Sequence, residues 1–318
     1  MSMINKTVKL IMRAVRQVAV FALFFVFFPF FSSHVSAHEN IDLLIVNSDY
    51  SVKKYALAQD VFEANQEKPS ISINLPDLSS DEASDLIKKN QFKIIYCIGT
   101  KAYLLVQRLV PEQNIVFSSA INWRRLPVTE KSYGIAQELP AGMQLMMYRY
   151  LFPEIKKIGV LYSKQFNNEL LQEAIQSAED MGIDVIGQDV SDGQNLSTAI
   201  KKLLPEVDAL WLISDPHVLA DRAAVSVIFQ QTKISKKPVF TYSKVFIDFG
   251  ALLVISADTP TIGRQVSARV DDLLGGRVDM ERVSIPAGSH VVLNMKQLKN
   301  YSLKLNKEAL GSVNQIIE

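Results

Sequence analysis

The chain has 318 residues, with 34 Lys and Arg against 33 Asp and Glu, four His and one Cys. This near balance of charge excludes the strongly basic surface on which nucleic-acid binding depends, and it argues against a polybasic membrane patch. Hydrophobic residues make up 48% of the chain and no low-complexity tract is present, so we expect a globular protein of one large or two modest domains.

Residues 1–37 have the pattern of a cleavable secretory signal. They carry four basic residues and no acidic one, then the apolar run Val18–Phe31, then short side chains up to Ala37. The alternative is a retained membrane anchor. The apolar run has 14 residues and contains Pro29, whereas a spanning helix needs about 20. We therefore expect cleavage after Ala37 and export to the periplasm of a Gram-negative cell. The alternative left open is that some molecules keep the signal as an anchor.

The mature chain would comprise residues 38–318, or 281 residues. Loss of the four basic residues leaves 30 basic against 33 acidic residues, a net charge of −3. The single cysteine, Cys97, lies inside the apolar run Ile94–Ile98 and cannot form an internal disulfide on its own. We expect it to be a buried core residue. No cysteine follows the apolar run of the signal, so a lipid-modified N-terminus is not expected.

Strands and helices alternate from residue 41 onward. The expected strands of the first series are Ile41–Val46, Ile71–Leu75, Phe92–Ile98 and Asn114–Phe117. The expected helices are Val52–Ala64, Ser79–Lys89 and Lys101–Val110. Repeated β-α-β units predict a parallel sheet with helices on both faces. The segment Trp123–Pro127 interrupts the pattern and suits a connection or a lid.

The alternation restarts at Ile158, which predicts a second lobe. Its expected strands are Ile158–Tyr162, Ile183–Ile186, Asp208–Ile213, Pro238–Tyr242 and Gly250–Ile255, and a helix is expected from Gly263 to Leu274. The predicted fold class is α/β, with two Rossmann-like lobes of parallel strands joined by a three-strand hinge. Crossings between the lobes are expected near 133–139, 250–258 and 283–292. The predicted N-terminal lobe is 38–133 plus 251–283, and the predicted C-terminal lobe is 134–250 plus 284–318.

Ligands of open parallel sheets bind at the carboxyl ends of the strands, where loops and helix N-termini converge. An aspartate there, Asp215, would hold a ligand ammonium, and aromatic rings would cover an apolar part of the ligand. The alternative is that these polar residues only cap helices. The expected ligand-binding residues are Ser48, Asp49, Gly99, Thr100, Ser118, Ser119, Tyr162, Ser163, Phe166, Asn167, Asp215, Tyr242 and Ser243.

Catalytic motifs are absent from the sequence. The four histidines are His34, His38, His217 and His290, and none belongs to a zinc-protease, redox, phosphate-loop or serine-hydrolase motif. We therefore expect no catalysis, no cofactor and no metal. Trp211 lies in an apolar strand and is expected in the core, whereas Trp123 would line either the cleft or the hinge.

Residues 134–310 resemble the substrate-binding proteins of ABC transporters, of the aromatic-amino-acid type that includes the tryptophan-binding lipoproteins. The resemblance implies a type I periplasmic-binding fold that closes on a small solute. At Ile121–Trp123 the chain departs from an Asp-Pro pair that is frequent in the family. The matching segments are LFPEIKKIGVLYS (151–163), AEDMGIDVIGQDV (178–190), VDALWLISDPHV (207–218), KPVFTYSKVFIDFGALLVISADTPTIGRQVSARVDDLLGG (237–276) and VVLNMKQLKNYSLKLNKEAL (291–310), with CIGTKAYLLV (97–106) as a weaker match.

Two functions use such a clamp. The first is a periplasmic solute receptor that delivers a small molecule, such as an amino acid of the aromatic type, to an ABC permease. The second is a ligand-sensing module that regulates a membrane signalling protein. In both, binding energy shifts the population toward the closed form. We expect a monomer, because a clamp must open freely and the chain has no coiled-coil heptads.

Overall fold

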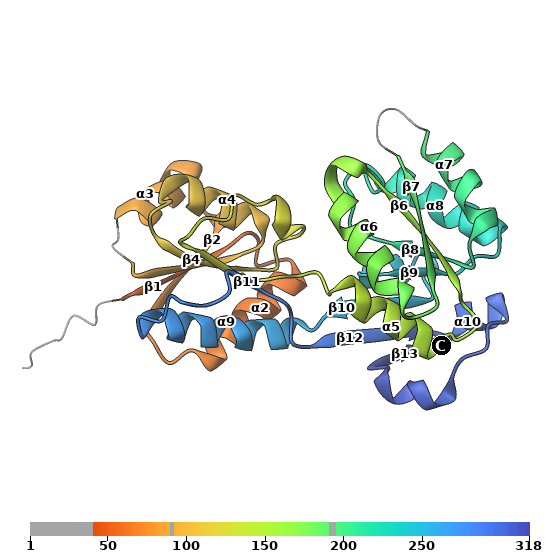
Figure 1. Cartoon of the computed structure of the whole chain (residues 1–318). Helices are drawn as coiled ribbons and strands as arrows, with labels where there is room; N and C mark the ends of the chain where they lie inside the picture. The colour runs from red at the N-terminus through yellow and green to blue at the C-terminus, as the bar shows by residue number, and fades with distance from the viewer. Residues whose placement is uncertain (1–40, 90–91, 191–194) are drawn as a thin grey trace, which may run out of the picture. The chain divides into compact units, whose positions relative to one another are not determined.

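The computed structural model describes residues 41–89, 92–190 and 195–318. The predicted signal, its cleavage site, His34 and His38 lie outside these residues. Residues 41–318 form one compact unit that contains two sheets (Figure 1). Within the described ranges, no helix is both long enough and apolar enough to cross a membrane.

The first sheet has six strands, all parallel, in the order β11-β5-β4-β3-β1-β2. Every residue of β1 and β3 is buried, as expected for parallel strands that helices cover on both faces. Their apolar runs therefore serve both faces of one sheet. The strands are β1 (Leu43–Asn47), β2 (Ser70–Asn74), β3 (Ile94–Ile98), β4 (Asn114–Ser118), β5 (Ser132–Ile135) and β11 (Val283–Ser284).

Alternate residues of β1 pack on different pairs of helices. Leu43 and Ile45 share an apolar cluster with α2 (Lys53–Asn65) and α9 (Thr259–Leu274). Leu44 and Val46 share another cluster with α3 (Ser80–Lys89) and α4 (Thr100–Leu109). The period of two along a strand thus divides one apolar run between two helical layers.

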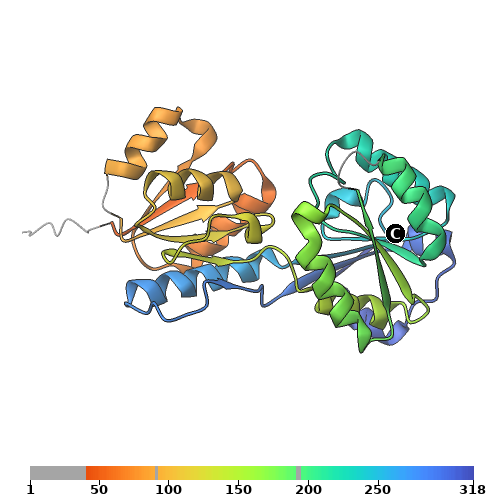
Figure 2. The same cartoon turned by 45° about the horizontal axis from the view of Figure 1, so that its top comes forward.

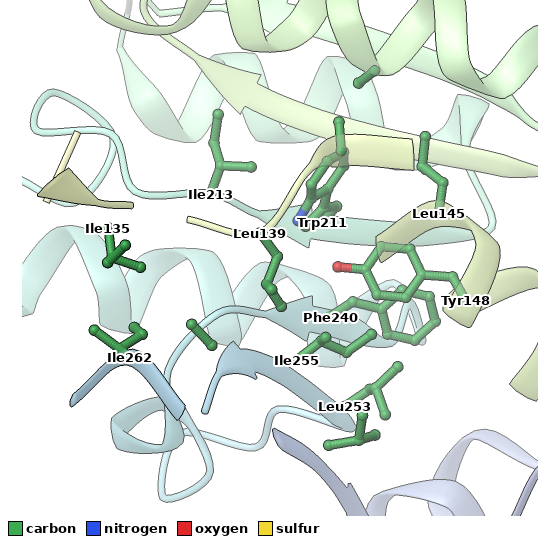
Figure 3. Packing of buried hydrophobic residues seen from close by; sticks show 14 of the residues in the cluster. Ile135, Leu139, Leu145, Tyr148, Trp211, Ile213, Phe240, Leu253, Ile255 and Ile262 are labelled. Atoms are coloured by element: carbon green, nitrogen blue, oxygen red, sulfur yellow. The ribbon is translucent and has the colours of Figure 1, made fainter. Parts of the chain in front are cut away.

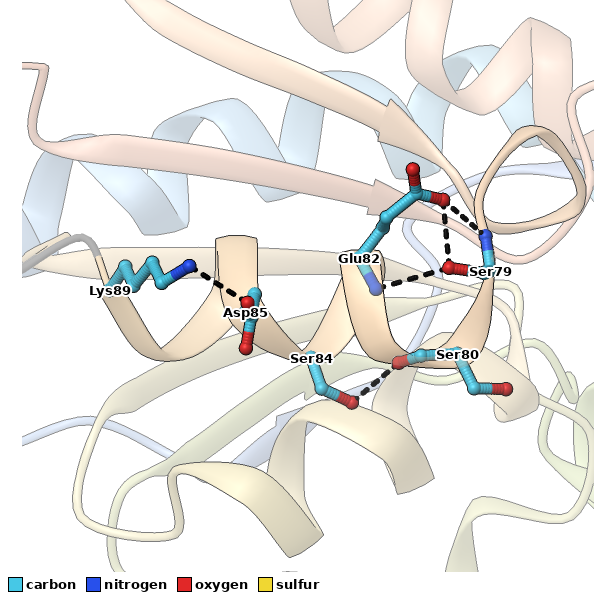
Figure 4. A network of polar contacts seen from close by, with 6 residues as sticks. All are labelled: Ser79, Ser80, Glu82, Ser84, Asp85 and Lys89. Atoms are coloured by element: carbon cyan, nitrogen blue, oxygen red, sulfur yellow. Dashed lines mark hydrogen bonds and ion pairs between the residues drawn. The ribbon is translucent and has the colours of Figure 1, made fainter.

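The start of α3 shows how a local sequence signal fixes a helix end (Figure 4). Ser79 Oγ accepts a hydrogen bond from the backbone N–H of Glu82, and Oε2 of Glu82 accepts one from the backbone N–H of Ser79 at 2.9 Å. This reciprocal pair is a capping box, which satisfies amide groups that the helix itself leaves unpaired. An exposed ion pair between Asp85 and Lys89, at 2.7 Å, follows along the same helix.

The second sheet has seven strands in the order β13-β12-β10-β9-β8-β6-β7. Its strands are parallel except that β12 runs antiparallel to β10. This antiparallel pair arises because the chain enters β12 from the first sheet. The strands are β6 (Lys157–Tyr162), β7 (Asp184–Asp189), β8 (Ala209–Leu212), β9 (Val239–Thr241), β10 (Leu253–Ala257), β12 (Ser289–Asn294) and β13 (Gln315–Ile317).

Helices also cover both faces of the second sheet (Figure 1 and Figure 2). One apolar cluster joins the sheet to α5 (Ala141–Leu151) and α6 (Lys164–Glu179), and another joins it to α7 (Leu196–Leu203) and α8 (Arg222–Ile234). The remaining helices are α10 (Met295–Tyr301) and the short 3-10 turns Leu75–Asp77, Trp123–Arg125, Leu204–Glu206, Lys244–Phe246 and Lys307–Ser312.

Three segments connect the sheets: 136–140 after β5, the junction of β10 with α9, and 285–288 before β12. These fall within the crossings expected from the sequence. The predicted lobe boundaries differ from the sheets in two respects. The predicted C-terminal lobe includes Gly134, Ile135 and Ser284, but these residues pair in the first sheet. Leu253–Ala257 was expected in the N-terminal lobe, but it pairs with β9 and β12 in the second sheet. The chain therefore crosses after this strand, at Asp258.

The helix α9 begins four residues earlier than the sequence indicated. Asp258 caps it by accepting a hydrogen bond from the backbone N–H of Thr261 at 3.0 Å. Gly263, expected to open the helix, lies inside it against α2. A Cβ at this position would lie 2.9 Å from Val61 Cγ1 and 3.2 Å from the carbonyl oxygen of Ala58. Gly263 therefore allows α2 and α9 to pack closely.

One apolar cluster includes residues of both sheets and of the first crossing (Figure 3). Leu139, on the crossing, belongs to the same cluster as Trp211 of β8 and Ile262 of α9. Tyr148 packs against Trp211 with ring centroids 5.8 Å apart. The expectation that Trp211 is a core residue is confirmed, because it is 1% exposed.

Candidate functional site

The predicted ligand residues of the first lobe lie at the carboxyl ends of β1, β3 and β4. Most of their side chains form hydrogen bonds with other groups of the protein. Ser48 Oγ accepts a hydrogen bond from the backbone N–H of Ala102 at 2.9 Å, which ties β1 to the start of α4. Gly99 has φ 87°, and a Cβ there would lie 2.7 Å from Ser48 Oγ. Asp49 is on an exposed turn, where hydrogen bonds from Ser51 lower the pKa of its carboxyl.

The next two strand ends follow the same pattern. The hydroxyls of Ser118 and Tyr96 are 2.7 Å apart in the core. Thr100 Oγ1 accepts from the backbone N–H of Ile121 at 3.2 Å. Ser119 differs, since it has a left-handed backbone, with φ 56°, and its buried hydroxyl has no partner among the described residues.

Asp215 does not have the role that the sequence suggested. It is buried, and its Oδ2 accepts from the backbone N–H of Ser163 at 2.7 Å and from Asn167 Nδ2 at 2.6 Å. Its Oδ1 accepts from the backbone N–H groups of His217 at 2.9 Å and Val218 at 3.2 Å. The carboxylate is saturated by donors of its own chain. Asp215 therefore joins the loop after β8 to the start of α6 through its contacts with Ser163 and Asn167. Because these donors already occupy both of its oxygens, the arrangement does not favour a ligand ammonium at Asp215.

Two predicted aromatic residues of the second lobe lie near the same loops. The ring of Phe166 has the guanidinium carbon of Arg125 4.6 Å from its centroid. The ring of His217 meets it edge-on at 4.8 Å. Tyr162 is half-buried, and burial raises the pKa of its hydroxyl. These rings pack against protein groups.

A cavity of about 660 Å³ lies where the crossings meet the strand ends of the second sheet. This volume is within the usual range of small-molecule sites, about 300–1,000 Å³. Two of the predicted ligand residues, Tyr242 and Ser243, line it, and the described residues that form its wall do not include the others. The wall consists of Lys53, Lys54, Leu57, Ile121, Asn122, Gln137, Glu138, Leu139, Gln144, Leu170, Trp211, Ile213, Ser214, Tyr242, Ser243, Lys244, Ile255, Ser256, Ala257, Asp258, Thr259, Pro260 and His290.

Glu138, on the first crossing, is the central acidic group of this cavity. Its Oε1 accepts from the backbone N–H of Asn122 at 2.5 Å. Its Oε2 is buried and has no hydrogen-bond partner among the described residues. Burial raises the pKa of the Glu138 carboxyl, against the lowering effects of the Asn122 N–H and of Arg124 and Lys54. An unpaired buried oxygen of this kind is uncommon in a folded protein, which makes Glu138 a candidate for ligand binding.

Lys54 and Gln137 complete the polar surroundings of Glu138. Burial lowers the pKa of the Lys54 ammonium, and the charge of Glu138 opposes this shift, so the two groups act on each other. Oε1 of Gln137 is also buried without a partner among the described residues. The cavity therefore presents two adjacent acceptors, one on Gln137 and one on Glu138.

The second sheet contributes a side chain that can donate a hydrogen bond, in contrast to the acceptors on Gln137 and Glu138. His290, on β12, has a buried Nε2 without a hydrogen-bond partner in the described part of the chain. Burial lowers the pKa of its ring, the positive charge of Lys244 adds to the shift, and Asp258 opposes it. Burial likewise raises the pKa of the Tyr242 hydroxyl, to which the charge of Glu138 contributes.

Apolar side chains form the rest of the wall. Leu139, Trp211, Ile213 and Ile255 belong to the core cluster and also border the cavity (Figure 3). Such a wall suits the apolar body of a small molecule, with the polar groups fixing its orientation. In the described part of the chain, no group of three or more His, Cys, Asp or Glu could hold a metal ion. Cys97 is buried, and burial raises the pKa of its thiol.

Several of these residues were not found by the strand-end rule. Glu138 and Gln137 lie within the predicted crossing near 133–139, and Lys54 lies within the first predicted helix. His290 belongs to no catalytic motif in the sequence, so no motif marks it as a site residue. The position of Glu138 on a predicted crossing could have identified it, because a segment that connects two lobes lies next to the space between them.

Residues 79–317 match the family described as ABC transporter substrate binding protein. Among curated relatives, a tyrosine-binding protein of Clostridioides difficile is 22% identical over 186 residues, which cover 58% of this chain and 52% of the relative. A D-ribose pyranase of Kosmotoga olearia is 27% identical over 84 residues, covering 26% of this chain and 61% of the relative. The chain thus spans about half to three fifths of the curated relatives that it matches.

Solved structures share the fold. An ABC domain in complex with L-Trp from Streptococcus pneumonia has a TM-score of 0.60 and 18% identity, covering 86% of this chain and all of that one. The ligand-free, open structure of a substrate binding protein with adhesive properties from Clostridium difficile has a TM-score of 0.68 and 15% identity, covering 87% and 99%. The predicted fold of two parallel-sheet lobes of the type I periplasmic-binding class is confirmed. Members of the matching family bind solutes outside the cytoplasm and are not catalysts, and the chain belongs to this family of ABC transporter substrate binding proteins.

Proposed function

We propose that the protein is the periplasmic solute receptor of an ABC importer and that it clamps a small, ammonium-bearing molecule of the amino-acid type. The observation that carries this proposal is the free oxygen of Glu138 on the wall of an apolar cavity. A carboxylate in such surroundings is costly unless it meets a positive partner. A ligand ammonium is that partner.

The acceptors on Glu138 and Gln137 suit a primary ammonium, which has three N–H donors and no acceptor. Oε2 of Glu138 and Oε1 of Gln137 offer two acceptors next to each other in the chain. The ammonium of Lys54 keeps the site near neutrality in the absence of ligand. A solute without N–H or O–H donors would leave these two oxygens unpaired.

The apolar wall favours a ligand with an aromatic or large aliphatic body. Trp211 presents an indole, and Leu139, Ile213 and Ile255 add aliphatic surface. Aromatic groups gain from such contacts beyond simple burial of area. The curated relative named for tyrosine binding and the solved structure with L-Trp support an aromatic amino acid as the first candidate.

The fold supports a clamp mechanism. The cavity wall takes residues from α2 in the first lobe, from the first crossing, and from β8, β10 and β12 in the second. A ligand that touches all of them favours the closed form, and closure presents a surface that the permease recognises. We propose that the chain is exported by a signal cleaved after Ala37 and works as a monomer.

The test is calorimetric titration of the exported, purified protein with the amino acids, backed by thermal unfolding. A ligand present at 100 times its dissociation constant should add about 2.7 kcal/mol of stability. We expect at least one apolar amino acid to bind wild-type protein and to lose affinity in Glu138→Gln. The control is Glu154→Gln, since Glu154 forms an exposed ion pair with Lys304 and neither residue lines the cavity. If ligands bound both variants as tightly as wild type, the proposed site would be wrong.

A further inference from the structure

The cavity has a second polar group of residues, on the side formed by the second sheet. His290 of β12 pairs across the sheet with Ser256 of β10, and both line the cavity. Lys244, in the turn after β9, lies on the same wall. Lys244 Nζ donates to Gln315 Oε1 at 2.8 Å, so its position is supported from β13. All four residues belong to the second lobe.

The free atom of His290 faces no donor or acceptor of the protein. Its Nε2 is buried without a partner in the described residues. The pKa of His290 is lowered first by burial and then by the charge of Lys244, whereas the charge of Asp258 opposes the shift. A neutral imidazole can donate one hydrogen bond, and Lys244 can donate as well. A carboxylate oxygen of a ligand in the cavity, next to this wall, would accept hydrogen bonds from both groups.

The two polar groups of residues differ in sign and in location. Gln137 and Glu138, on the first crossing, offer acceptors, whereas Lys244 and His290, on the second sheet, offer donors. A volume of about 660 Å³ corresponds to roughly 20 water-sized groups at ~30 Å³ each. An aromatic amino acid has fewer non-hydrogen atoms than this. The cavity therefore has room for a solute larger than a free amino acid.

We propose that Lys244 and His290 bind the carboxylate of the solute, and that the preferred solute is a dipeptide-like zwitterion with apolar side chains. This inference rests on the proposed function, because it takes the ammonium at Glu138 as given. The ammonium then lies at the crossing, the apolar side chains lie against Trp211 and Ile255, and the carboxylate lies at β12. In a free α-amino acid both charged groups are bonded to the same carbon, whereas in a dipeptide the peptide unit separates them.

Matched ligands test the carboxylate directly. Leucyl-phenylalanine and its C-terminal amide differ in the acidic oxygen alone, and phenylalanine with phenylalaninamide provides the same comparison for a single residue. Wild-type protein should bind the dipeptide at least about tenfold more tightly than its amide, as expected for hydrogen bonds to a charged group. Lys244→Met and His290→Phe should each abolish most of this preference. Lys233→Met, at an exposed lysine near the end of α8 that does not line the cavity, should keep it.

The outcomes separate the two proposals. The inference is overturned if the preference for the acid persists in Lys244→Met and His290→Phe and disappears in Lys54→Met, since Lys54 would then hold the carboxylate. It is also overturned if phenylalanine binds and the dipeptide does not. Either result leaves the proposed function intact. If Glu138→Gln binds every ligand as wild type does, the proposed function itself fails. Thermal unfolding of each variant shows that loss of preference does not come from loss of fold.

Discussion

The backbone N–H of Asn122 donates to Oε1 of Glu138 at 2.5 Å, and Asn122 Nδ2 donates to the carbonyl oxygen of Ser214 at 3.1 Å. One asparagine therefore connects the end of β4, the first crossing and the end of β8. The hydrogen bond fixes one oxygen of the Glu138 carboxylate and leaves the other available. In the sequence, Asn122 belongs to a segment that departs from the family pattern. In the structure, Asn122 positions the carboxylate of Glu138.

Glu138→Gln should weaken the binding of an ammonium-bearing ligand by ~2–5 kcal/mol, because a buried charge pair loses one partner. The same change should raise the thermal unfolding midpoint of the ligand-free protein, since it removes a carboxylate whose pKa is raised by burial. Opposite signs for affinity and stability are the mark of a binding residue. A variant that lost stability and affinity together would indicate a structural role for Glu138.

The pH dependence of stability should report the same carboxyl. Burial raises the pKa of Glu138, so the folded state binds its proton more tightly than the unfolded state does. Stability from this group is then present at low pH and is lost as pH rises through the raised pKa. Glu138→Gln should be more stable than wild type at neutral pH, and the difference should vanish as pH falls toward about 4.

Denaturant unfolding of both proteins over this pH range measures the difference, in which the other titrating groups cancel. Ligand affinity should follow the opposite sign, since the ammonium requires ionised Glu138 and affinity should drop as pH falls. A stability difference that stayed constant across the range would show that Glu138 does not titrate there.

Asp215→Ala should destabilise the fold by ~2–5 kcal/mol, because several buried donors lose their acceptor. Asp215→Asn keeps one acceptor oxygen and should fall between the alanine variant and wild type. The ligand affinity of whatever protein remains folded should stay near that of wild type, which distinguishes this residue from Glu138. Asp248→Ala, on an exposed turn, is the control and should change stability little. Chemical denaturation and calorimetry decide the matter.

Gly263→Ala should destabilise the protein by ~1–3 kcal/mol, because the new methyl group would overlap Val61 and the backbone of Ala58. The packing of α9 on α2 would have to loosen. Gly311→Ala is a suitable control, since no heavy atom lies within 4 Å of the position its Cβ would take. Equal unfolding free energies for the two variants would show that the helices adjust at no cost.

Much of the fold could be predicted because its signals are local. Apolar runs such as Leu43–Val46 mark buried strands, and Ser79 with Glu82 marks the start of a helix. What could not be predicted is the sheet that a strand joins. Leu253–Ala257 is equally apolar in either lobe, and only its pairing with β9 and β12 decides its place.

The site was less accessible to prediction for a physical reason. Asp215 and Tyr242 both follow strands and look alike in the sequence, but the first is saturated by its own chain and the second lines the cavity. Glu138 and Lys54 become neighbours only when the crossing and α2 come together on folding. The burial that leaves Oε2 of Glu138 without a partner is a property of the assembled unit, so periodicity along the chain does not report it.

The strand order of the first sheet has a consequence for how the molecule is made. Its edge strand β11 and its packing helix α9 come from residues 259–284, far from the strands Leu43–Ile135 that they join. While the chain is being made, the early strands form before these late segments are available, so the face of α2 that packs on α9 stays uncovered until then. Neither half of the polypeptide contains a complete lobe. The first lobe is therefore completed only when residues from early and late parts of the chain come together. We expect a chain shortened before residue 259 not to complete this lobe.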